Sequence, residues 1–439
     1  MSILWSASLT YAFRLVLFIL SLVTNIILAR SLGPAGRGVY AIAVLLPTIL
    51  TLIASFGIGQ ANVYYVSRGS LDKKVLVGSS ITAAIVLGLA TYAVLALVIW
   101  LGGRHTLLGV APRFLLLGGI CLPFTLATTF MQGVLHGEKR FVELNIVMLC
   151  QTLSLAVMLV ILLAVPIDRV TSSVGAWTAS SILTGVLAVG LVGQLTPISV
   201  AIHLPTIRAL LRYGTLTYLG TLTSFVNYRF DLLLVSVFSG ATQVGFYAVG
   251  AGVAEVIWFL PNSAYIALAP RVAAGAEEES ANLSAHATRA ILVSAAASAA
   301  LLAIVTPGAI LVFFGRAFGP SVIAVWLLLP GIVTFSGWKI MSCYLLGRNA
   351  LKQDLTAATA AMVFTLGLDF LLIPRFGFRG AAVASSIAYT IAMLVDLYWV
   401  VRRSGLPARK WLIGAPSDAE PIIHRVRVFR LRRNSSKAS

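Results

Sequence analysis

Long apolar runs constrain this chain more than any other feature, because each is long enough to cross a bilayer as a helix. A transmembrane helix needs about 20 predominantly apolar residues. Of the 439 residues, 59% are hydrophobic and 10% are charged, whereas soluble domains carry about 25% charged residues. We therefore expect an all-α polytopic membrane protein rather than a soluble enzyme. Twelve transmembrane helices are predicted, at residues 8–30, 39–66, 77–101, 114–135, 142–165, 173–194, 213–238, 244–269, 288–314, 320–346, 355–373 and 378–401.

The distribution of basic residues predicts how these helices are oriented. The first run has no Lys or Arg ahead of it and is followed by Arg30, so we do not expect a cleavable signal peptide. A cytoplasmic N-terminus puts 21 Lys and Arg residues in the cytoplasm, ten of them in the tail, and 8 outside. Because cytoplasmic loops carry the excess positive charge, both termini are predicted to be cytoplasmic, in the inner or plasma membrane. The basic run at 425–433 is expected to contact anionic lipid, and no nucleic acid partner is expected.

The second half of the chain repeats the first. SLGPAGRGVYA at 31–41 and SGATQVGFYA at 239–248 align at an offset of 207, which matches two glycines, a tyrosine and an alanine. GAWTASSI at 175–182 and GAAVASSI at 380–387 align at an offset of 205. Two anchors at nearly equal offsets predict six plus six helices, related by an axis along the membrane normal. The expected domains are a bundle at 1–194, a cytoplasmic linker at 195–212, a bundle at 213–401 and a basic tail at 402–439.

Seven charged residues lie well inside the predicted helices, away from their first and last two residues, where a charge costs at least about 2.5–3.5 kcal/mol and is a functional candidate. Asp369 and Asp396 could lie near the membrane interfaces, and Arg14 and Lys339 could extend to the headgroups. The remaining three are Arg229, Asp231 and Glu255. Counting residues outward from the short connection between their helices puts Arg229 and Glu255 at nearly the same depth. We therefore predict an ion pair between them, either structural or active in transport.

Polar residues follow helical stripes beside these charges, which places each stripe on one helix face. One stripe holds Arg14, Ser21 and Asn25, and the other holds Glu255, Trp258 and Asn262. Such stripes indicate either a packed helix contact held by hydrogen bonds or a water-filled cavity, and we favour the cavity. Aromatic residues such as Trp258 could stack on sugar rings, although packing or interfacial roles are favoured. Further polar residues expected at the cavity are Asn62, Gln132, Asn227 and Lys339.

Residues 27–69, ILARSLGPAGRGVYAIAVLLPTILTLIASFGIGQANVYYVSRG, and residues 228–251, YRFDLLLVSVFSGATQVGFYAVGA, carry a family resemblance. They resemble the polysaccharide and oligosaccharide flippases of the multidrug/oligosaccharidyl-lipid/polysaccharide exporter superfamily. The resemblance implies two six-helix bundles around a central cavity, and alternating access that moves a lipid-linked glycan from the cytoplasmic to the outer leaflet. It also implies a polyprenyl-phosphate carrier, with a glycan polymerase and glycosyltransferases as candidate partners. Related lipid II flippases carry fourteen helices, so the predicted number of twelve argues against that branch.

A phosphate-bearing cargo needs cations in the cavity, because an unpaired anion in hydrocarbon is costly. The candidate cations are Arg14, Arg229 and Lys339, with Arg suited to bidentate contact. Either the membrane potential or protonation of an acid could drive transport. The predicted substrate-binding residues are Arg14, Asn25, Asn62, Asn227, Arg229, Trp258, Asn262 and Lys339. The predicted coupling or ion-pair residues are Asp231, Glu255 and Asp369.

Two other functions compete with the flippase. A multidrug or cation antiporter of the same superfamily would use the acids for substrate and not need the cations. A membrane glycan polymerase or ligase would need a large outer loop, but the longest expected loops, 195–212 and 270–287, are cytoplasmic, and the run Glu277, Glu278 and Glu279 is expected in one of them. Five His and three Cys residues show no metal-ligand spacing, and no nucleotide-binding loop is evident. We predict no enzyme activity and no metal or cofactor.

Overall fold

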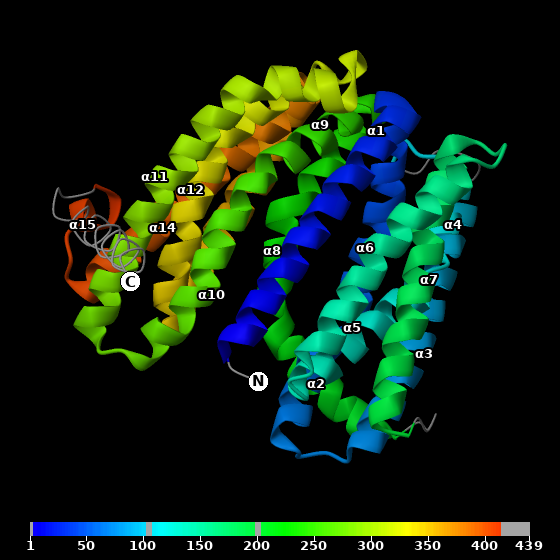
Figure 1. Cartoon of the computed structure of the whole chain (residues 1–439), viewed down its shortest axis with the longest axis horizontal. Helices are drawn as coiled ribbons and strands as arrows, with labels where there is room; N and C mark the ends of the chain where they lie inside the picture. Colours follow the sequence, from blue (N-terminus) through cyan, green and yellow to red (C-terminus); the bar gives the residue numbers. More distant parts are fainter. Residues whose placement is uncertain (1–2, 102–107, 198–202, 414–439) are drawn as a thin grey trace, which may run out of the picture. The chain divides into compact units, whose positions relative to one another are not determined.

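The computed structural model describes residues 3–101, 108–197 and 203–413, without the side chains of residues 3–15 and of several residues between 216 and 226. The described elements are helices (Figure 1). They are α1 (Ile3–Ala54), α2 (Ile58–Arg68), α3 (Lys73–Leu101), α4 (Pro112–Gly119), α5 (Leu122–Gly137), α6 (Phe141–Leu163), α7 (Arg169–Leu195), α8 (Leu204–Ser239), α9 (Ala241–Ala254), η1 (Glu255–Trp258), α10 (Phe259–Ala274), α11 (Glu277–Ala309), η2 (Ile310–Phe314), η3 (Arg316–Phe318), α12 (Ser321–Gly347), α13 (Leu351–Phe376), α14 (Phe378–Ser404) and α15 (Ala408–Leu412).

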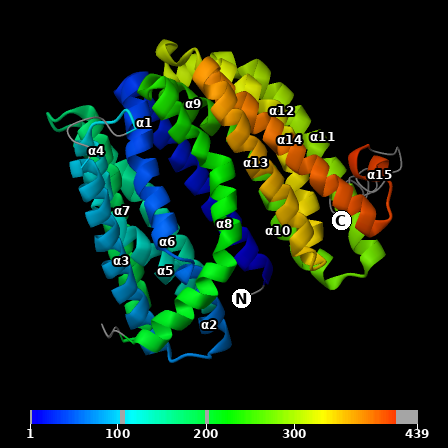
Figure 2. The ribbon, with the colours of Figure 1, turned by 180° about the vertical axis from the view of Figure 1, so that it is seen from behind.

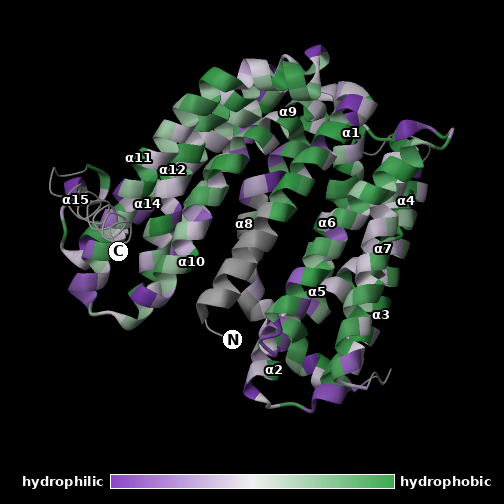
Figure 3. Cartoon of the chain, in the orientation of Figure 1, coloured by the Kyte–Doolittle hydropathy of each residue, from purple (hydrophilic) through white to green (hydrophobic). Residues whose placement is uncertain are grey.

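Ten helical segments among the described residues are long and apolar enough to cross a membrane. Their outward faces are apolar: on α3, Val86, Leu89 and Val94 are each more than half exposed. Figure 3 shows hydrophobic residues along much of α3 and α11. Such surfaces are unfavourable in water and favourable in lipid. The prediction of an all-helical, multi-pass membrane protein is confirmed, and the count of twelve crossings stays a prediction.

Several helix boundaries differ from those expected from the apolar runs. The run at 39–66 is interrupted after α1, because Phe56 and Gly57 both have positive φ before α2 begins. The expected loop at 270–287 was wrong, because only residues 275–276 separate α10 from α11. Likewise, α8 already begins at Leu204, inside the expected linker. Hydropathy detects only the membrane-buried part of a helix, whereas capped polar turns extend beyond it.

The chain divides into two compact units, each formed by discontinuous segments. Unit 1 contains Met1–Val249, Ala309–Ser321 and Phe370–Ala381, and unit 2 contains Gly250–Gly308, Val322–Asp369 and Ala382–Ser439. The predicted domain boundaries at 194 and 213 stay predictions.

Each unit has its own closely packed interior. In unit 1, α2, α3, α5 and α7 contribute to one buried apolar cluster, which includes Ile58, Leu76 and Phe130. Figure 2 shows α6 beside α7, and these two helices are in contact. In unit 2, α12 approaches α14 where Ser386 donates a hydrogen bond to the Leu327 carbonyl at 2.6 Å. Small and hydroxyl-bearing residues at such contacts are typical of helix packing in membranes.

The repeated motif forms a pair of matching breaks within unit 1. Gly33 has φ 63° and ψ 179°, and Gly240 has φ 81° and ψ 171°, a conformation that favours glycine. The first break bends α1, whose two arms can be followed in blue in Figure 1. The second separates α8 from α9.

Two further glycines bring these breaks into contact with each other. A Cβ on Gly38 would lie 2.6 Å from the carbonyl carbon of Ala241, and a Cβ on Gly245 would lie 2.8 Å from that of Pro34. Because Pro34 and Ala241 also align at the offset of 207, the contact is self-complementary, as at a two-fold axis. This geometry supports the duplication, and the six-plus-six division stays a prediction.

A second pair of turns also repeats. Lys139, between α5 and α6, and Asn349, between α12 and α13, have φ values of 57° and 55°. The next residue, Arg140 or Ala350, donates its amide hydrogen to the carbonyl five residues earlier, at 2.9 and 2.8 Å. The offset is 210 residues, close to those of the sequence anchors. The duplication therefore extends to turns whose side chains have diverged.

Candidate functional site

Lys339, a predicted substrate-binding residue on α12, lies against polar neighbours within unit 2. Its Nζ is 5.1 Å from the ring centroid of Tyr265 on α10, a favourable cation–π geometry. Asp354 on α13 and Cys343 on α12 are within its electrostatic range. Both lie toward the predicted cytoplasmic end of their helices, and extension of Lys339 to the headgroups stays a prediction. The ammonium group therefore lies over an aromatic ring and within the electrostatic influence of an acid.

Two acids for which a place near the membrane interfaces was one alternative are fully buried. Asp369 on α13 and Asp396 on α14 both have 0% exposure. Trp338 lies near Asp396, but among the described residues neither carboxyl oxygen of Asp396 has a hydrogen bond of acceptable geometry. Asp354 contributes a like charge. A buried carboxyl group in such surroundings is a candidate proton-binding group.

Trp258 belongs to an aromatic cluster in unit 2. Its ring centroid is 4.7 Å from that of Phe335 on α12 and 6.4 Å from that of Tyr389 on α14. Trp338 meets Phe335 edge-on at 5.6 Å. These contacts are those of helix packing, the alternative favoured from the sequence. One turn along the chain, Asn262 is exposed on α10.

Asn25 is held inside the bent helix α1 by a residue that the sequence placed in an outer loop. Arg37 is only 8% exposed and donates a hydrogen bond to Asn25 Oδ1 at 2.8 Å. Its guanidinium carbon is 5.3 Å from the ring centroid of Tyr40. Arg37 is buried because the bend at Gly33 folds it back against the first arm. The residue that aligns with Arg37 in the second repeat, Val244, is also buried. Comparing the two repeats could therefore have indicated that Arg37 is buried.

Asp231 is also held inside unit 1. It is 4% exposed, and its carboxylate accepts hydrogen bonds from the Tyr247 hydroxyl and, at 2.7 Å, from the Leu232 amide. Tyr247 aligns with Tyr40 of the first repeat. The repeated tyrosine therefore contacts a cation in the first copy and an anion in the second.

Asn62 and Asn227 are both buried in unit 1. Asn62 has no exposed surface, donates to the Phe130 carbonyl at 3.1 Å and accepts from the Ser80 hydroxyl at 3.1 Å. These bonds join α2, α3 and α5. The geometry of Asn62 is that of a packed helix contact, the alternative to a cavity, and its substrate-binding role stays a prediction.

The remaining predicted site residues are distributed over both units. The side chain of Arg14 lies outside the described residues. Arg229 is half-buried on α8 in unit 1, and Glu255 begins η1 in unit 2. The ion pair between Arg229 and Glu255 stays a prediction, and so does the central cavity. Among the described residues, no group of three His, Cys, Asp or Glu side chains could hold a metal ion.

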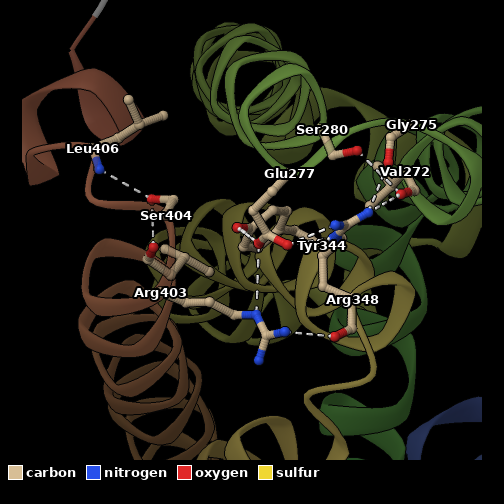
Figure 4. Close-up of polar contacts among 10 residues, drawn as sticks. Val272, Gly275, Glu277, Ser280, Tyr344, Arg348, Arg403, Ser404 and Leu406 are labelled. Carbon is tan, nitrogen blue, oxygen red and sulfur yellow. Dashed lines mark hydrogen bonds and ion pairs between the residues drawn. The ribbon is translucent and has the colours of Figure 1, made fainter.

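Glu277 organises a polar cluster in unit 2 (Figure 4). Its carboxylate lies 2.6 Å from Arg348 Nη2 and 3.6 Å from Arg403 Nε, and it accepts a 2.7 Å hydrogen bond from the Tyr344 hydroxyl. Arg348 also donates to the Gly275 carbonyl at 2.8 Å. Glu277 is exposed, as expected, but it is the first residue of α11 rather than part of a loop. It joins the start of α11 to the ends of α12 and α14.

The first part of the basic tail packs on the same region. Trp411 on α15 has 0% exposure, and its ring centroid is 5.5 Å from that of Tyr344. Arg289 on α11 donates a 2.7 Å hydrogen bond to the Lys410 carbonyl. These residues thus contact protein, while the basic run at 425–433, predicted to contact lipid, lies outside the described residues.

Glu277→Gln is expected to destabilise the protein by about 1–2 kcal/mol, between the values for exposed and buried ion pairs, because Glu277 is 44% exposed and Arg348 only 18%. Thermal unfolding of the purified protein in detergent measures this. Glu278→Gln is the matched control, since Glu278 is exposed in the same first turn of α11 and shares the helix-dipole effect. Equal melting temperatures for the two variants would contradict the assigned role of Glu277.

Unit 1 carries the corresponding ion pair with its charges exchanged. Lys73, the first residue of α3, lies 2.8 Å from Glu138. Glu138 and Arg348 are related by the offset of 210 found for the repeated turns, and Lys73 and Glu277 by 204. A search for identical residues misses this repeat, because the position is retained while both signs are reversed.

Comparison with known proteins agrees with this architecture. The structure is similar to that of lipid II flippase MurJ in an inward closed conformation, with a TM-score of 0.77 and 17% identity, covering 93% of this chain and 89% of that chain. It is also similar to an inward-facing multidrug resistance MATE family transporter of the MOP superfamily, with a TM-score of 0.70, 16% identity and coverages of 89% and 94%. An outward-facing MATE structure matches with a TM-score of 0.57, 15% identity and coverages of 88% and 95%. At these identities the similarity shows a shared fold.

No curated protein sequence matches the chain significantly. A family model described as polysaccharide biosynthesis protein matches residues 4–276, which is more than half of the chain. The resemblance noted from residues 27–69 and 228–251 is thereby confirmed. The chain belongs to the polysaccharide biosynthesis protein family of membrane proteins.

Proposed function

We propose that this protein is a flippase that moves a lipid-linked oligosaccharide or polysaccharide repeat unit from the cytoplasmic to the outer leaflet. The family match over residues 4–276 is the observation that carries the proposal. The fold, which is similar to those of a lipid II flippase and of MATE transporters, supports transport by alternating access. In this proposal the protein lies in the cell membrane with both termini in the cytoplasm and catalyses no covalent reaction. A glycan polymerase and glycosyltransferases are its proposed partners.

Cationic side chains would bind the phosphate of a polyprenyl-phosphate carrier. Arg14, Arg229 and Lys339 are the proposed contacts, because a phosphate entering a low-dielectric region needs paired charge. Lys339 lies over the Tyr265 ring and within the electrostatic influence of Asp354, and substrate phosphate would compete with Asp354 for it. Polar contacts to the glycan are proposed for Asn25, Asn62, Asn227, Trp258 and Asn262.

Two driving forces are compatible with an anionic cargo. A potential that is negative inside favours outward movement of anions by about 2.3 kcal/mol per charge and 100 mV. Alternatively, a buried acid could bind and release a proton in each cycle. Asp231, Glu255 and Asp369 are the proposed coupling residues, and the burial of Asp396 adds it to this group.

A drug or cation antiporter is the second candidate function. The similarity to MATE transporters favours it. So does the burial of the acids Asp231 and Asp369, both less than 5% exposed. In that function the acids would bind the substrate, and Lys339 would be dispensable.

Depletion of the protein in its host is expected to cause a lipid-linked glycan to accumulate on the inner leaflet, because synthesis continues while flipping stops. Extraction of lipid-linked intermediates, with a membrane-impermeant probe to assign the leaflet, measures this. Restoring expression should reverse the accumulation. Sensitivity to cationic drugs with unchanged glycan intermediates would instead support the antiporter.

A further inference from the structure

A polar pocket of about 470 Å³ lies in unit 1, where the end of α8 and the start of α9 meet the turn between α13 and α14. Its lining includes Ser239, Gln243, Arg375, Gly377 and Arg379. The turn has the sequence RFGFR at 375–379 and reverses at Gly377, which has φ 58°. The glycine therefore brings two arginines to one pocket.

Several other arginines among the described residues contact a carboxylate or a backbone carbonyl, whereas Arg375 and Arg379 have no acidic side chain beside them. Arg348 and Arg403 contact Glu277, Arg140 contacts Glu143, and Arg30 donates to backbone carbonyls. Among the described residues, neither Arg375 nor Arg379 has an acidic partner within ion-pair distance. Two like charges at one pocket repel each other unless an anion lies between them. The pocket thus lacks a counter-charge of its own.

The surrounding side chains fit an oxyanion. The guanidinium carbon of Arg379 is 5.9 Å from the ring centroid of Phe378, which packs against Phe246 at 5.9 Å. This contact holds one guanidinium at the pocket wall. Gln243 and Ser239 supply an amide and a hydroxyl close to Gly377: a Cβ there would lie 3.1 Å from Gln243 Oε1 and 3.4 Å from Ser239 Oγ. Guanidinium groups bind phosphate oxygens in pairs, and neutral donors add direction.

We propose that this pocket binds a phosphate group through Arg375 and Arg379, with Gln243 and Ser239 as neutral donors. On the predicted orientation it opens at the outer membrane surface. The phosphate could belong to a lipid headgroup or be free in solution, since both present the same oxygens. The proposal does not depend on the flippase function, because it concerns a site formed within unit 1 alone.

Binding by the full chain in a non-ionic detergent tests the proposal. Inorganic phosphate and short-chain dihexanoylphosphatidic acid are the two probes, titrated by calorimetry at low ionic strength because exposed charges are screened by salt. Wild-type protein is expected to bind at least one of them saturably. Binding of the lipid alone assigns the site to headgroups, whereas equal binding of both assigns it to the phosphate group itself. Loss of charge in Arg375→Gln/Arg379→Gln should weaken binding by about tenfold or more.

Two further variants distinguish specific binding in the pocket from nonspecific attraction to the positive surface charge. Arg316→Gln removes an exposed arginine outside the pocket and should leave affinity unchanged. Gln243→Leu keeps every charge and should weaken binding severalfold through loss of a donor. All variants should keep the wild-type melting temperature. If Arg375→Gln/Arg379→Gln does not, Arg375→Lys/Arg379→Lys replaces it; this variant keeps the charges but loses the paired guanidinium contacts, and should weaken binding. The proposal is overturned if neither probe binds, or if Arg316→Gln weakens binding as much as the pocket variant.

Discussion

Gly245→Ala is expected to destabilise the folded protein by about 3 kcal/mol or more. The new methyl group would lie 2.8 Å from the carbonyl carbon of Pro34 and closer still to its oxygen. Overpacking of a core costs about 1–3 kcal/mol, and here the neighbour is backbone at a helix bend, which cannot rotate away. The matched control is Gly252→Ala in the same helix, α9, where nothing lies within 4 Å of the added carbon. That variant should be neutral or slightly stabilising, since Ala is the better helix former.

The reciprocal variant Gly38→Ala should behave in the same way, because its Cβ would meet Ala241. The double variant should cost less than the sum of the two, since both glycines open one shared contact. Melting temperatures in detergent, together with elution as a single species, measure these effects. Equal melting temperatures for Gly245→Ala and Gly252→Ala would show that the α1–α9 contact is absent from the protein in solution.

Lys339→Gln is expected to reduce flipping of the lipid-linked glycan by at least about tenfold, or 1.4 kcal/mol. In the proposed function this ammonium group binds the carrier phosphate, and glutamine has no charge to replace it. Lys339→Arg should retain much of the activity, because it keeps the charge and the contact with Tyr265. Flipping by purified protein in liposomes, followed with an outer-leaflet probe, is the measurement.

Lys352→Gln provides the control for this prediction, since Lys352 is an exposed lysine near the start of α13. Its loss changes the net charge equally and should leave flipping unaffected. Normal transport by folded Lys339→Gln protein would instead favour the antiporter, in which the acids carry the substrate. Loss of activity in both lysine variants would indicate a general effect of surface charge.

The amino-acid sequence by itself determined the membrane class, the family resemblance and the glycines of the repeated hairpin. Each of these depends on neighbouring residues: a run of about 20 apolar residues identifies a membrane helix, and Gly33 and Gly240 occupy matched positions in two short motifs. It also indicated which ionisable residues lie within apolar runs, including Asp231 and Lys339. Helix ends were less predictable, because polar first turns such as that beginning at Glu277 lie outside the hydropathy signal.

Only the tertiary structure decided which polar side chains meet. Asn62 bonds to a carbonyl 68 residues away, and Glu277 binds an arginine 71 residues away, so neither partner could be found on the same helix. Arg37 is buried because the bend at Gly33 folds its helix back on itself. Hydropathy reports how a segment partitions between water and lipid, whereas the partner of a buried polar group depends on which helix surfaces pack together.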